Sequence, residues 1–385
     1  MDFELSKESH MIREAAKKFS RKELEPHASE IDEKEIFPRE AWIKLSELGF
    51  PGLVTPEKYG GSGYDYVTLV SVMEEFGKGC VATAGTYSVH ITTQAMLLKY
   101  GTEEQLRTYL PQMITGKTIG ALGLTESNAG SDLSLIKTEA VLKDEHYLLN
   151  GNKIFITSAG EADIYFIFAR TRPDSTKNNL TAFIVKNGSK GFEIGKIEEK
   201  MGYRGSPTGE LIFRDCPVPL NQRLGEEGQG FRIVMDGLNY GRISVGAIAI
   251  GIAQAAYNGC LKYVKERKQF GQTIASFQGI QWMLADMATA ISASRLLLYQ
   301  AASMADKGKP FIKEASMAKC FATDTAMRVT TDVVQLFGGY GYLKDYTVER
   351  YMREAKIFQI VEGTNQIQRS TIAKEMLKTN ARIYP

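Results

Sequence analysis

The amino-acid sequence predicts an α+β protein of three domains: a helical N-terminal domain, a middle β domain of the barrel or sandwich type, and a C-terminal four-helix bundle. Three observations predict this order. Apolar residues recur at helical spacing over 1–118, short β-rich runs fill 119–228, and long amphipathic helical patterns fill 229–385. The chain has 385 residues, which is too many for one ordinary hydrophobic core.

The N-terminal segment carries signals for the start and the end of helices. Pro38 is expected to begin a helix that ends at Gly49, because proline suits the first helical turn and glycine the end. Thr102 followed by Gln105 forms a capping-box pattern. This pattern predicts a helix that starts there and reaches Gly116.

The middle segment alternates strand-like runs with turn residues. Asn150-Gly151 lies between two of these runs, and because this dipeptide is typical of a hairpin turn we expect a turn there. The runs predict a compact all-β domain, and they cover residues 119–125, 153–157, 163–169, 180–185 and 210–213.

The C-terminal segment returns to helical spacing. Ile280, Leu284, Met287 and Ile291 follow one another at helical steps, so they should share one face of a helix. Long amphipathic helices joined by short connections predict an antiparallel four-helix bundle.

The charge balance and the cysteines exclude several classes of protein. With 47 basic and 45 acidic residues the net charge is +2, so no general basic field points to nucleic acid. The four cysteines are scattered without metal-ligand spacing, which indicates no metal site and a reduced, intracellular setting. The N-terminus has no apolar signal core, and no apolar run looks long enough to span a bilayer. We therefore expect a cytoplasmic protein with no membrane association.

Four stretches carry residues suited to chemistry, although each alone has an ordinary structural explanation. Residues 122–132 form a turn rich in Gly, Asn and Ser that could bind a ligand through backbone N–H groups, or be a plain β-turn. Residues 153–157 alone are a strand, and the basic residues of 266–271 could simply be a solvated helix end. The glycines of 335–342 could admit a ligand close to the backbone.

Glu362 is the candidate carboxylate. It follows the apolar residues Ile360 and Val361 and precedes Gly363. A carboxylate in apolar surroundings has a raised pKa and becomes a useful base near neutrality. An exposed glutamate in a loop is the ordinary alternative, and this pattern by itself leaves both open.

In combination these stretches resemble the acyl-CoA dehydrogenase family. The chain carries, in the family's order, Thr-Glu-x-x-x-Gly-Ser-Asp at 125–132, Glu-Arg-x-x-Phe-Gly at 266–271, Gln-x-x-Gly-Gly-x-Gly-Tyr at 335–342 and Glu-Gly-Thr-x-x-Ile-Gln-Arg at 362–369. The resemblance covers nearly the whole chain. It implies an FAD-dependent enzyme that converts an acyl-CoA thioester to the trans-2-enoyl-CoA and passes electrons to an electron-transfer flavoprotein.

The resemblance implies that FAD lies between the β domain and the helical bundle. Phe155 stands where the family often has Trp, so it keeps an aromatic face but lacks the indole N–H. The residues that the resemblance places on FAD within one chain are Leu122, Leu124, Thr125, Ser131, Phe155, Ile156 and Thr157, with Thr364 and Gln366 toward the adenine end and Asn365 between them.

A second set of residues matches positions that reach the FAD of a neighbouring subunit in the family. A cofactor site shared in this way implies a homo-oligomer, in this family usually a tetramer. The set comprises Arg267, Phe270, Gln278, Gln335, Leu336, Phe337, Gly338 and Gly339.

Glu362 matches the family's catalytic base, which takes the α-proton of the thioester. A backbone N–H on the Gly363 side would stabilise the thioester oxygen, as in an oxyanion hole. Some relatives carry the base at the position of Gly241, where glycine cannot act, so Glu362 is the candidate that remains. The substrate contacts implied by the resemblance are Ser131, Asn239, Tyr240, Arg242 and Gly363.

Three alternatives use the same fold. An enoyl-CoA reductase would run the reaction backwards with an electron-transfer flavoprotein, and the sequence does not exclude it. A non-catalytic, flavin-binding assembly protein would not need the intact Glu362. Acyl-CoA oxidases are usually much longer than this chain. Residues 81–100 contain no Asp or Glu, which argues against the extra carboxylate that relatives acting on cyclic acyl groups use.

Overall fold

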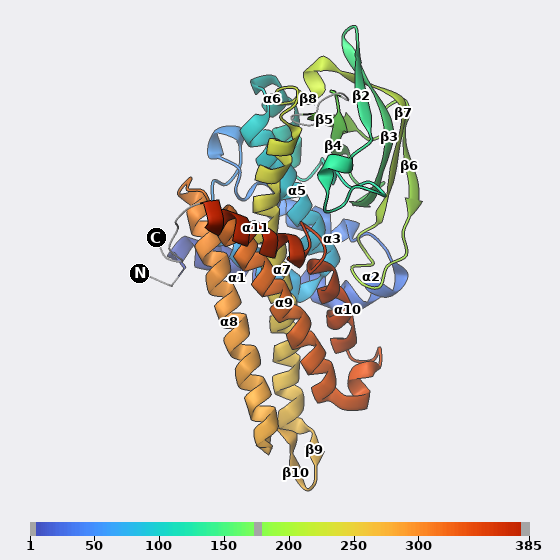
Figure 1. Ribbon diagram of the computed structural model, residues 1–385. Helices are drawn as coiled ribbons and strands as arrows, with labels where there is room; N and C mark the ends of the chain where they lie inside the picture. The colour runs from blue at the N-terminus through green and yellow to red at the C-terminus, as the bar shows by residue number, and fades with distance from the viewer. Residues whose placement is uncertain (1–4, 173–178, 379–385) are drawn as a thin grey trace.

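The computed structural model describes residues 5–172 and 179–378. Helices of the N-terminal part pack against the upper half of a long C-terminal bundle, and a β domain lies at one end of the molecule (Figure 1). The N-terminal helices are α1 (Lys7–Phe19), α2 (Ala28–Lys34), α3 (Arg39–Glu47), α4 (Tyr66–Gly79), α5 (Val81–Tyr100) and α6 (Glu103–Ile114). The three-domain fold predicted from the sequence is confirmed.

The predicted helix signals act as expected. Pro38 is the residue before α3, and Gly49, just beyond its end, takes the left-handed conformation with φ +77°. Thr102 and Gln105 form a complete capping box at the start of α6, in which each side chain binds the backbone N–H of the other residue.

The middle domain is built on one eight-stranded mixed sheet. Its strand order is β6-β7-β3-β2-β4-β5-β8, and β1 pairs in parallel with β4. In β4 and β5 all residues except the last of each strand are buried, and most of them are apolar, so the middle of the sheet is covered on both faces. The strands are β1 (Gly120–Gly123), β2 (Glu139–Lys143), β3 (His146–Thr157), β4 (Ile164–Arg170), β5 (Leu180–Lys186), β6 (Phe192–Ile197), β7 (Thr208–Pro219) and β8 (Arg223–Leu224).

The hairpin turn predicted at Asn150-Gly151 was wrong. Strand β3 runs straight through this dipeptide, and the turn lies earlier, where Asp144 adopts φ +52°. Gly151, with φ +139°, instead marks an irregularity in the pairing of β3 with β7. The Asn150 side chain exchanges two hydrogen bonds with Asp215 of that strand. Pairing with a strand far along the chain therefore overrode the local turn preference.

The C-terminal domain is dominated by three long antiparallel helices. Met287 and Ile291 are buried as the helical spacing predicted. Between the first two long helices lies a small hairpin at the end of the molecule opposite the sheet (Figure 1). The elements are α7 (Gly230–Glu266), β9 (Lys268–Gln269), β10 (Gln272–Thr273), α8 (Gln278–Asp306), α9 (Ile312–Phe337), α10 (Val348–Phe358) and α11 (Asn365–Lys378).

The expectation that no apolar run is long enough to cross a bilayer needs correction. In the part of the chain that the structure describes, α7 alone is long and apolar enough by length and composition. Most of its apolar window, 72%, is buried inside the protein, where it packs as the central helix of the core.

Candidate active site

The site is centred on Glu362, in the short loop between α10 and α11. Glu362 has φ +56° and Gly363 has φ +85°, so two successive residues adopt the left-handed conformation. This conformation is costly for a non-glycine residue, and such strain is concentrated at functional sites. The turn directs the carboxylate at α7, where a Cβ on Gly241 would lie only 2.6 Å from Glu362 Oε2.

The Glu362 carboxylate lies in a setting that would suit a base. Its Oε2 atom is buried and accepts no hydrogen bond from any residue that the structure describes. Burial raises the pKa of Glu362 to about 7, and the charges of Arg242 and Lys319 oppose this rise. A carboxylate with a pKa near the working pH is well matched to proton abstraction. The sequence attributed a raised pKa to the apolar neighbours of Glu362, but Ile360 is 50% exposed, so the burial of the carboxylate comes from the packing of the loop against other helices.

Two of the predicted substrate residues lie beside the base, on α7. Arg242 is 1% exposed and donates from Nη1 to Asn239 Oδ1 at 2.8 Å, while its Nε lies 3.5 Å from the Glu362 carbonyl oxygen. Tyr240 turns toward the N-terminal domain, where its ring stacks on Tyr66 with centroids 4.7 Å apart. Asn239 and Arg242 thus form part of the wall behind Glu362.

The loop that carries the base is held by side chains that the sequence reasoning missed. Gln368 donates from Nε2 to the carbonyl oxygens of Glu362 and Gly363, at 3.0 and 2.8 Å. Lys319, on α9, donates to the Gly363 carbonyl and to Asn365 Oδ1, both at 2.9 Å. In the sequence, Lys319 falls among the apolar residues of α9, and a lysine at such a buried position could have indicated that it binds a group inside the protein.

The remaining loop residues differ in exposure. The side chain of Asn365 is 3% exposed and is engaged inside the protein, so it supports the loop instead of facing outward. Thr364 Oγ1 accepts the N–H of Ile367, while Gln366 is exposed.

The β domain presents a second part of the predicted site. Phe155 is 60% exposed and has φ +58°, at a bulge where the pairing of β3 with β7 shifts. A bulky residue rarely adopts this conformation, and a bulge of this kind turns a side chain outward next to functional sites. The neighbouring side chain of Ile156 is buried in the core, and Thr157 is partly exposed.

The predicted turn next to Phe155 is anchored by a buried ion pair. Lys153, 0% exposed, donates to Glu126 Oε1 at 2.7 Å and to the Leu124 carbonyl at 3.1 Å. Thr125 accepts the N–H of Ile154 at 2.8 Å, which ties the turn to β3. Leu122 is partly buried on β1, and Ser131 is exposed further along the turn. The sequence motif did not reveal that Glu126 and Lys153 form an ion pair that anchors this turn.

The set predicted to reach a neighbouring subunit lies elsewhere, around the β9–β10 hairpin. Phe270 is 93% exposed with φ +53°, and Arg267 lies over the ring of Tyr340 at 5.4 Å. Gln278, Gln335, Gly338 and Gly339 are exposed close to this hairpin, and nothing lies within 4 Å of a Cβ built on either glycine. The side chains of Leu336 and Phe337 are instead buried in the core.

One chain therefore does not bring the two predicted sets together. The helix α7 begins at the β domain and ends at Glu266, directly before Arg267, and its 37 residues span about 55 Å. Figure 1 shows the sheet and the hairpin at opposite ends of the molecule. Among the described residues, no group of three His, Cys, Asp or Glu side chains could hold a metal ion, and the four cysteines are buried and form no disulfide.

Comparison with known proteins gives a consistent picture over the whole chain. Family models of the acyl-CoA dehydrogenases match in three consecutive parts: the N-terminal domain at 6–117, the middle domain at 121–216 and the C-terminal domain at 228–377. The acryloyl-CoA reductase (NADH) of Anaerotignum propionicum is 48% identical over 380 residues, which cover 98% of this chain and 96% of that one.

Two solved structures match just as fully. The butyryl-CoA dehydrogenase of Megasphaera elsdenii is 44% identical, with a TM-score of 0.96 over 98% of this chain and all of that one. A chain solved under the heading "Electron transferring flavoprotein of Acidaminococcus fermentans" is 48% identical, with a TM-score of 0.97 over 98% of this chain and all of that one.

Proposed function

The chain belongs to the acyl-CoA dehydrogenase family of FAD-dependent oxidoreductases, and on this basis we propose that it removes two hydrogens across Cα–Cβ of a short-chain acyl-CoA thioester with Glu362 as the base. The observation that carries the proposal is the buried Glu362 carboxylate, whose Oε2 lacks a partner among the described residues. The short chain is supported by the similarity to butyryl-CoA dehydrogenase.

The chain's own groups supply the proton chemistry. Glu362, ionised, accepts the proton from Cα, and the electron pair of that C–H bond forms the new double bond as a hydride leaves Cβ. Negative charge develops on the thioester oxygen during this step, so a hydrogen-bond donor there lowers the barrier. In the described residues the N–H groups of Glu362 and Gly363 donate to no acceptor, which leaves them free for this oxygen.

The residues present fit FAD. The outward ring of Phe155 and the open surface over Gly338 and Gly339 provide room for a flat ligand and for a close approach to the backbone. FAD, when bound, supplies the acceptor for the hydride. In our proposal it is held by Leu124, Thr125, Ser131, Phe155 and Thr157 of one chain and by Arg267, Phe270, Gln278 and Gln335–Gly339 of another.

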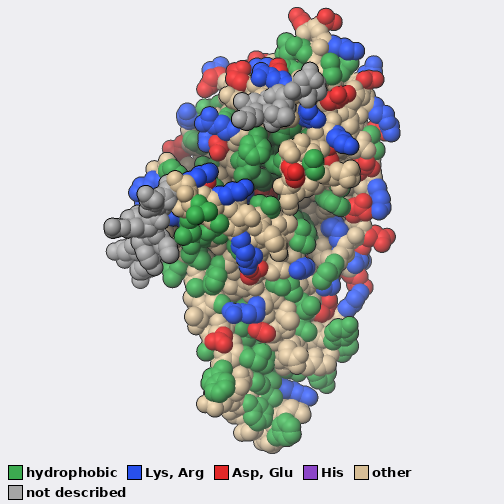
Figure 2. Space-filling model, in the orientation of Figure 1, with side chains coloured by type: hydrophobic (Ala, Val, Ile, Leu, Met, Phe, Trp, Pro, Cys, Tyr) green, Lys and Arg blue, Asp and Glu red, His purple; other side chains and the backbone are tan. Residues whose placement is uncertain are grey.

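A shared cofactor requires a homo-oligomer, and we propose a tetramer. The separation of the two sets of residues within one chain supports this proposal. So does the surface near the hairpin, where apolar side chains gather at the end of the bundle (Figure 2). There Phe270, Tyr342 and Trp282 are 93%, 86% and 61% exposed, and large exposed apolar groups mark interaction surfaces.

Replacement of Glu362 by Gln tests the function. The substitution keeps the size of the side chain but removes the base, so reduction of bound FAD by butyryl-CoA under anaerobic conditions should slow by at least about 10²-fold. The FAD content and the binding of the acyl-CoA should stay unchanged. A variant that bleaches the flavin within a few-fold of the parent rate would show that another group is the base.

Enoyl-CoA reduction is the second candidate, because a relative of 48% identity is an acryloyl-CoA reductase. The same Glu362 would then act as the acid, and a pKa of about 7 keeps it partly protonated at neutrality. Comparing the initial rates of butyryl-CoA oxidation and of crotonyl-CoA and acryloyl-CoA reduction, with the same dye couple, distinguishes the two directions.

We propose an electron-transfer flavoprotein as the redox partner. The structural relative described under that heading supports this choice. Oxygen is the rival acceptor. Rapid formation of peroxide from butyryl-CoA and oxygen, without any other acceptor, would contradict the proposal.

A further inference from the structure

We propose that Lys319 is a positioning residue for the base: its buried ammonium group holds the 362–365 loop in place and keeps the Glu362 carboxylate ionised during the reaction. The inference rests on the proposed role of Glu362 as the base. Lys319 lies on α9, is 0% exposed, and comes from a part of the chain more than 40 residues before the loop.

Lys319 fixes the 362–365 loop to α9 through two hydrogen bonds. Its Nζ donates to two neutral oxygens, Gly363 O and Asn365 Oδ1, each at 2.9 Å, and in the described part of the chain it forms no ion pair. An ammonium group buried without a carboxylate partner lowers the stability of the fold. A packed apolar side chain at position 319 would be less destabilising.

Lys319 acts together with Gln368 and Arg242 to fix the peptide groups of the loop. The carbonyl of Glu362 faces Arg242 and Gln368, and that of Gly363 faces Lys319 and Gln368. In a trans peptide the N–H points away from the carbonyl of the preceding residue. Arg242 and Gln368 hold the Glu362 carbonyl toward the protein interior, which turns the Gly363 N–H to the opposite side, where the resemblance places the thioester oxygen. Lys319 holds the next peptide group, through the Gly363 carbonyl.

The same ammonium acts on the base through its charge. Burial lowers the pKa of Lys319 to about 8, and burial raises that of Glu362 to about 7. The positive charge of Lys319 lowers the pKa of Glu362, and the negative charge of Glu362 raises the pKa of Lys319, so each group favours the charged form of the other. The two charged forms coexist between about pH 7 and pH 8.

The other groups that face Lys319 do not titrate in this range. Arg242 on α7 remains a cation, since an arginine pKa lies far above neutrality. Asp324 on α9 accepts hydrogen bonds from Arg369 and Asn365, and its pKa is lowered. Burial raises the pKa of the Cys320 thiol above its usual value, which keeps it neutral. The falling limb of a pH profile should therefore report Lys319.

The test compares three variants: Lys319→Met, Lys319→Arg and the control Lys313→Met, which removes a partly exposed lysine of the same helix that pairs with Glu314. The rate of FAD reduction by butyryl-CoA is measured from pH 5.5 to 10 on holoenzyme whose FAD content and melting temperature have been checked. The parent should show a rising limb near 7 and a falling limb near 8.

Lys319→Met should lose the falling limb and shift the rising limb upward by about one pH unit, because a nearby cation no longer favours the carboxylate. The rate at pH 7 should fall about tenfold or more, with a change in KM of less than a few-fold. Lys319→Arg should keep the rising limb but lose the falling limb below pH 10, since arginine stays charged. Lys313→Met should match the parent.

The outcomes separate this inference from the proposed function. A Lys319→Met enzyme with the parent's rising limb and rate overturns the inference, and so does a Lys319→Arg enzyme that retains the falling limb near pH 8. Where the Met variant loses its FAD, the Arg variant decides alone. An active Glu362→Gln enzyme instead overturns the proposed base, whatever the Lys319 variants do.

Discussion

At the residue scale, the contact between Gly241 and Glu362 explains why one position is glycine and the other carries the acid. The two residues occupy one volume, because a Cβ on Gly241 would lie 2.6 Å from Glu362 Oε2 and 2.8 Å from its Cδ. A carboxylate placed at either position would thus point to the same spot. The family's two alternative positions for the base therefore place a carboxylate in the same part of the site.

We predict that the base can be moved across this contact. Glu362→Gly alone should lose about 10² to 10⁴ in the rate of FAD reduction. Adding Gly241→Glu should recover at least about tenfold, because the new carboxylate enters the space that the old one leaves. The rate is measured by anaerobic mixing with butyryl-CoA. A double variant no faster than Glu362→Gly would contradict the shared position.

A matched control separates this exchange from crowding. Gly241→Glu in the presence of Glu362 places two carboxylates in one volume, and like charges at such a distance oppose each other's ionisation. This single variant should therefore be slower than the parent, while the double variant gains relative to its own Glu362→Gly background.

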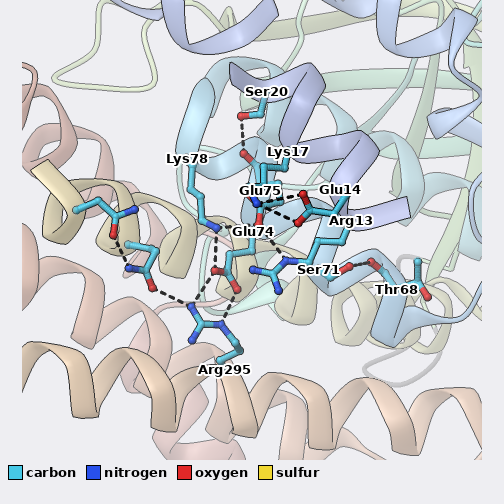
Figure 3. A network of polar contacts seen from close by, with 12 residues as sticks. Arg13, Glu14, Lys17, Ser20, Thr68, Ser71, Glu74, Glu75, Lys78 and Arg295 are labelled. Atoms are coloured by element: carbon cyan, nitrogen blue, oxygen red, sulfur yellow. Dashed lines mark hydrogen bonds and ion pairs between the residues drawn. The ribbon is translucent and has the colours of Figure 1, made fainter. Parts of the chain in front are cut away.

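At the scale of elements, a buried polar network joins α1, α4, α7 and α8 (Figure 3). Arg295 of α8 donates two hydrogen bonds of 2.8 Å to Glu74 of α4 and a third, of 3.0 Å, to Gln254 of α7. Arg13 of α1 donates to Glu75, next along α4. The network lines an open groove of about 980 Å³ that does not include Glu362.

We predict that Arg295→Met destabilises the fold by about 3 kcal/mol, because it leaves the 2%-exposed Glu74 without its main partner. Lys78, 3.3 Å from Glu74, provides partial compensation. Urea unfolding of the two proteins measures the difference. Lys17→Met, which removes an exposed pair with Glu14, should change stability by less than about 1 kcal/mol. Equal losses in both variants would show that burial of the pair does not matter.

The network also predicts a dependence on pH. Burial alone would raise the pKa of Glu74, but the hydrogen bonds from Arg295 and the nearby positive charges outweigh it and hold the pKa at about 2. A carboxylate with a lowered pKa adds stability above its unfolded value of about 4.5, and this stability is lost as the pH falls from there toward 2. The free energy of unfolding of the parent, measured by urea unfolding at a series of pH values, should thus include a contribution from Glu74 that falls between about pH 4.5 and pH 2.

At the scale of the whole molecule, the β-domain part of the predicted cofactor site and the part around the β9–β10 hairpin lie at opposite ends of the molecule. We predict that Arg267→Ala lowers both the FAD content and the size of the oligomer, because the residue would act at a subunit boundary. Light scattering and the flavin absorbance per chain measure both. Arg214→Ala, which removes an exposed pair with Glu193 on the β domain, should change neither. Full FAD content together with an unchanged mass would refute the placement of Arg267.

The sequence by itself determined the order of the domains, the long helices, the capping box at Thr102 and the motif that contains Glu362. These features are local: helical spacing, end signals and short motifs depend on residues a few positions apart. The same local reasoning failed at Asn150-Gly151, where pairing with β7 decided the conformation. The pairing of β3 with a distant strand stabilises the extended conformation more than the local turn preference stabilises a turn.

Only the tertiary structure decided what surrounds the base. Gly241 and Lys319 reach Glu362 and its loop from positions 121 and 43 residues earlier, as the sequence numbers show, and local spacing carries no information about such contacts. The sequence could place an acid beside apolar neighbours, but its pKa depends on burial and on charges that come from other helices. Folding brings α7, α9 and the 362–365 loop together, and this is what raises the pKa of Glu362 to about 7.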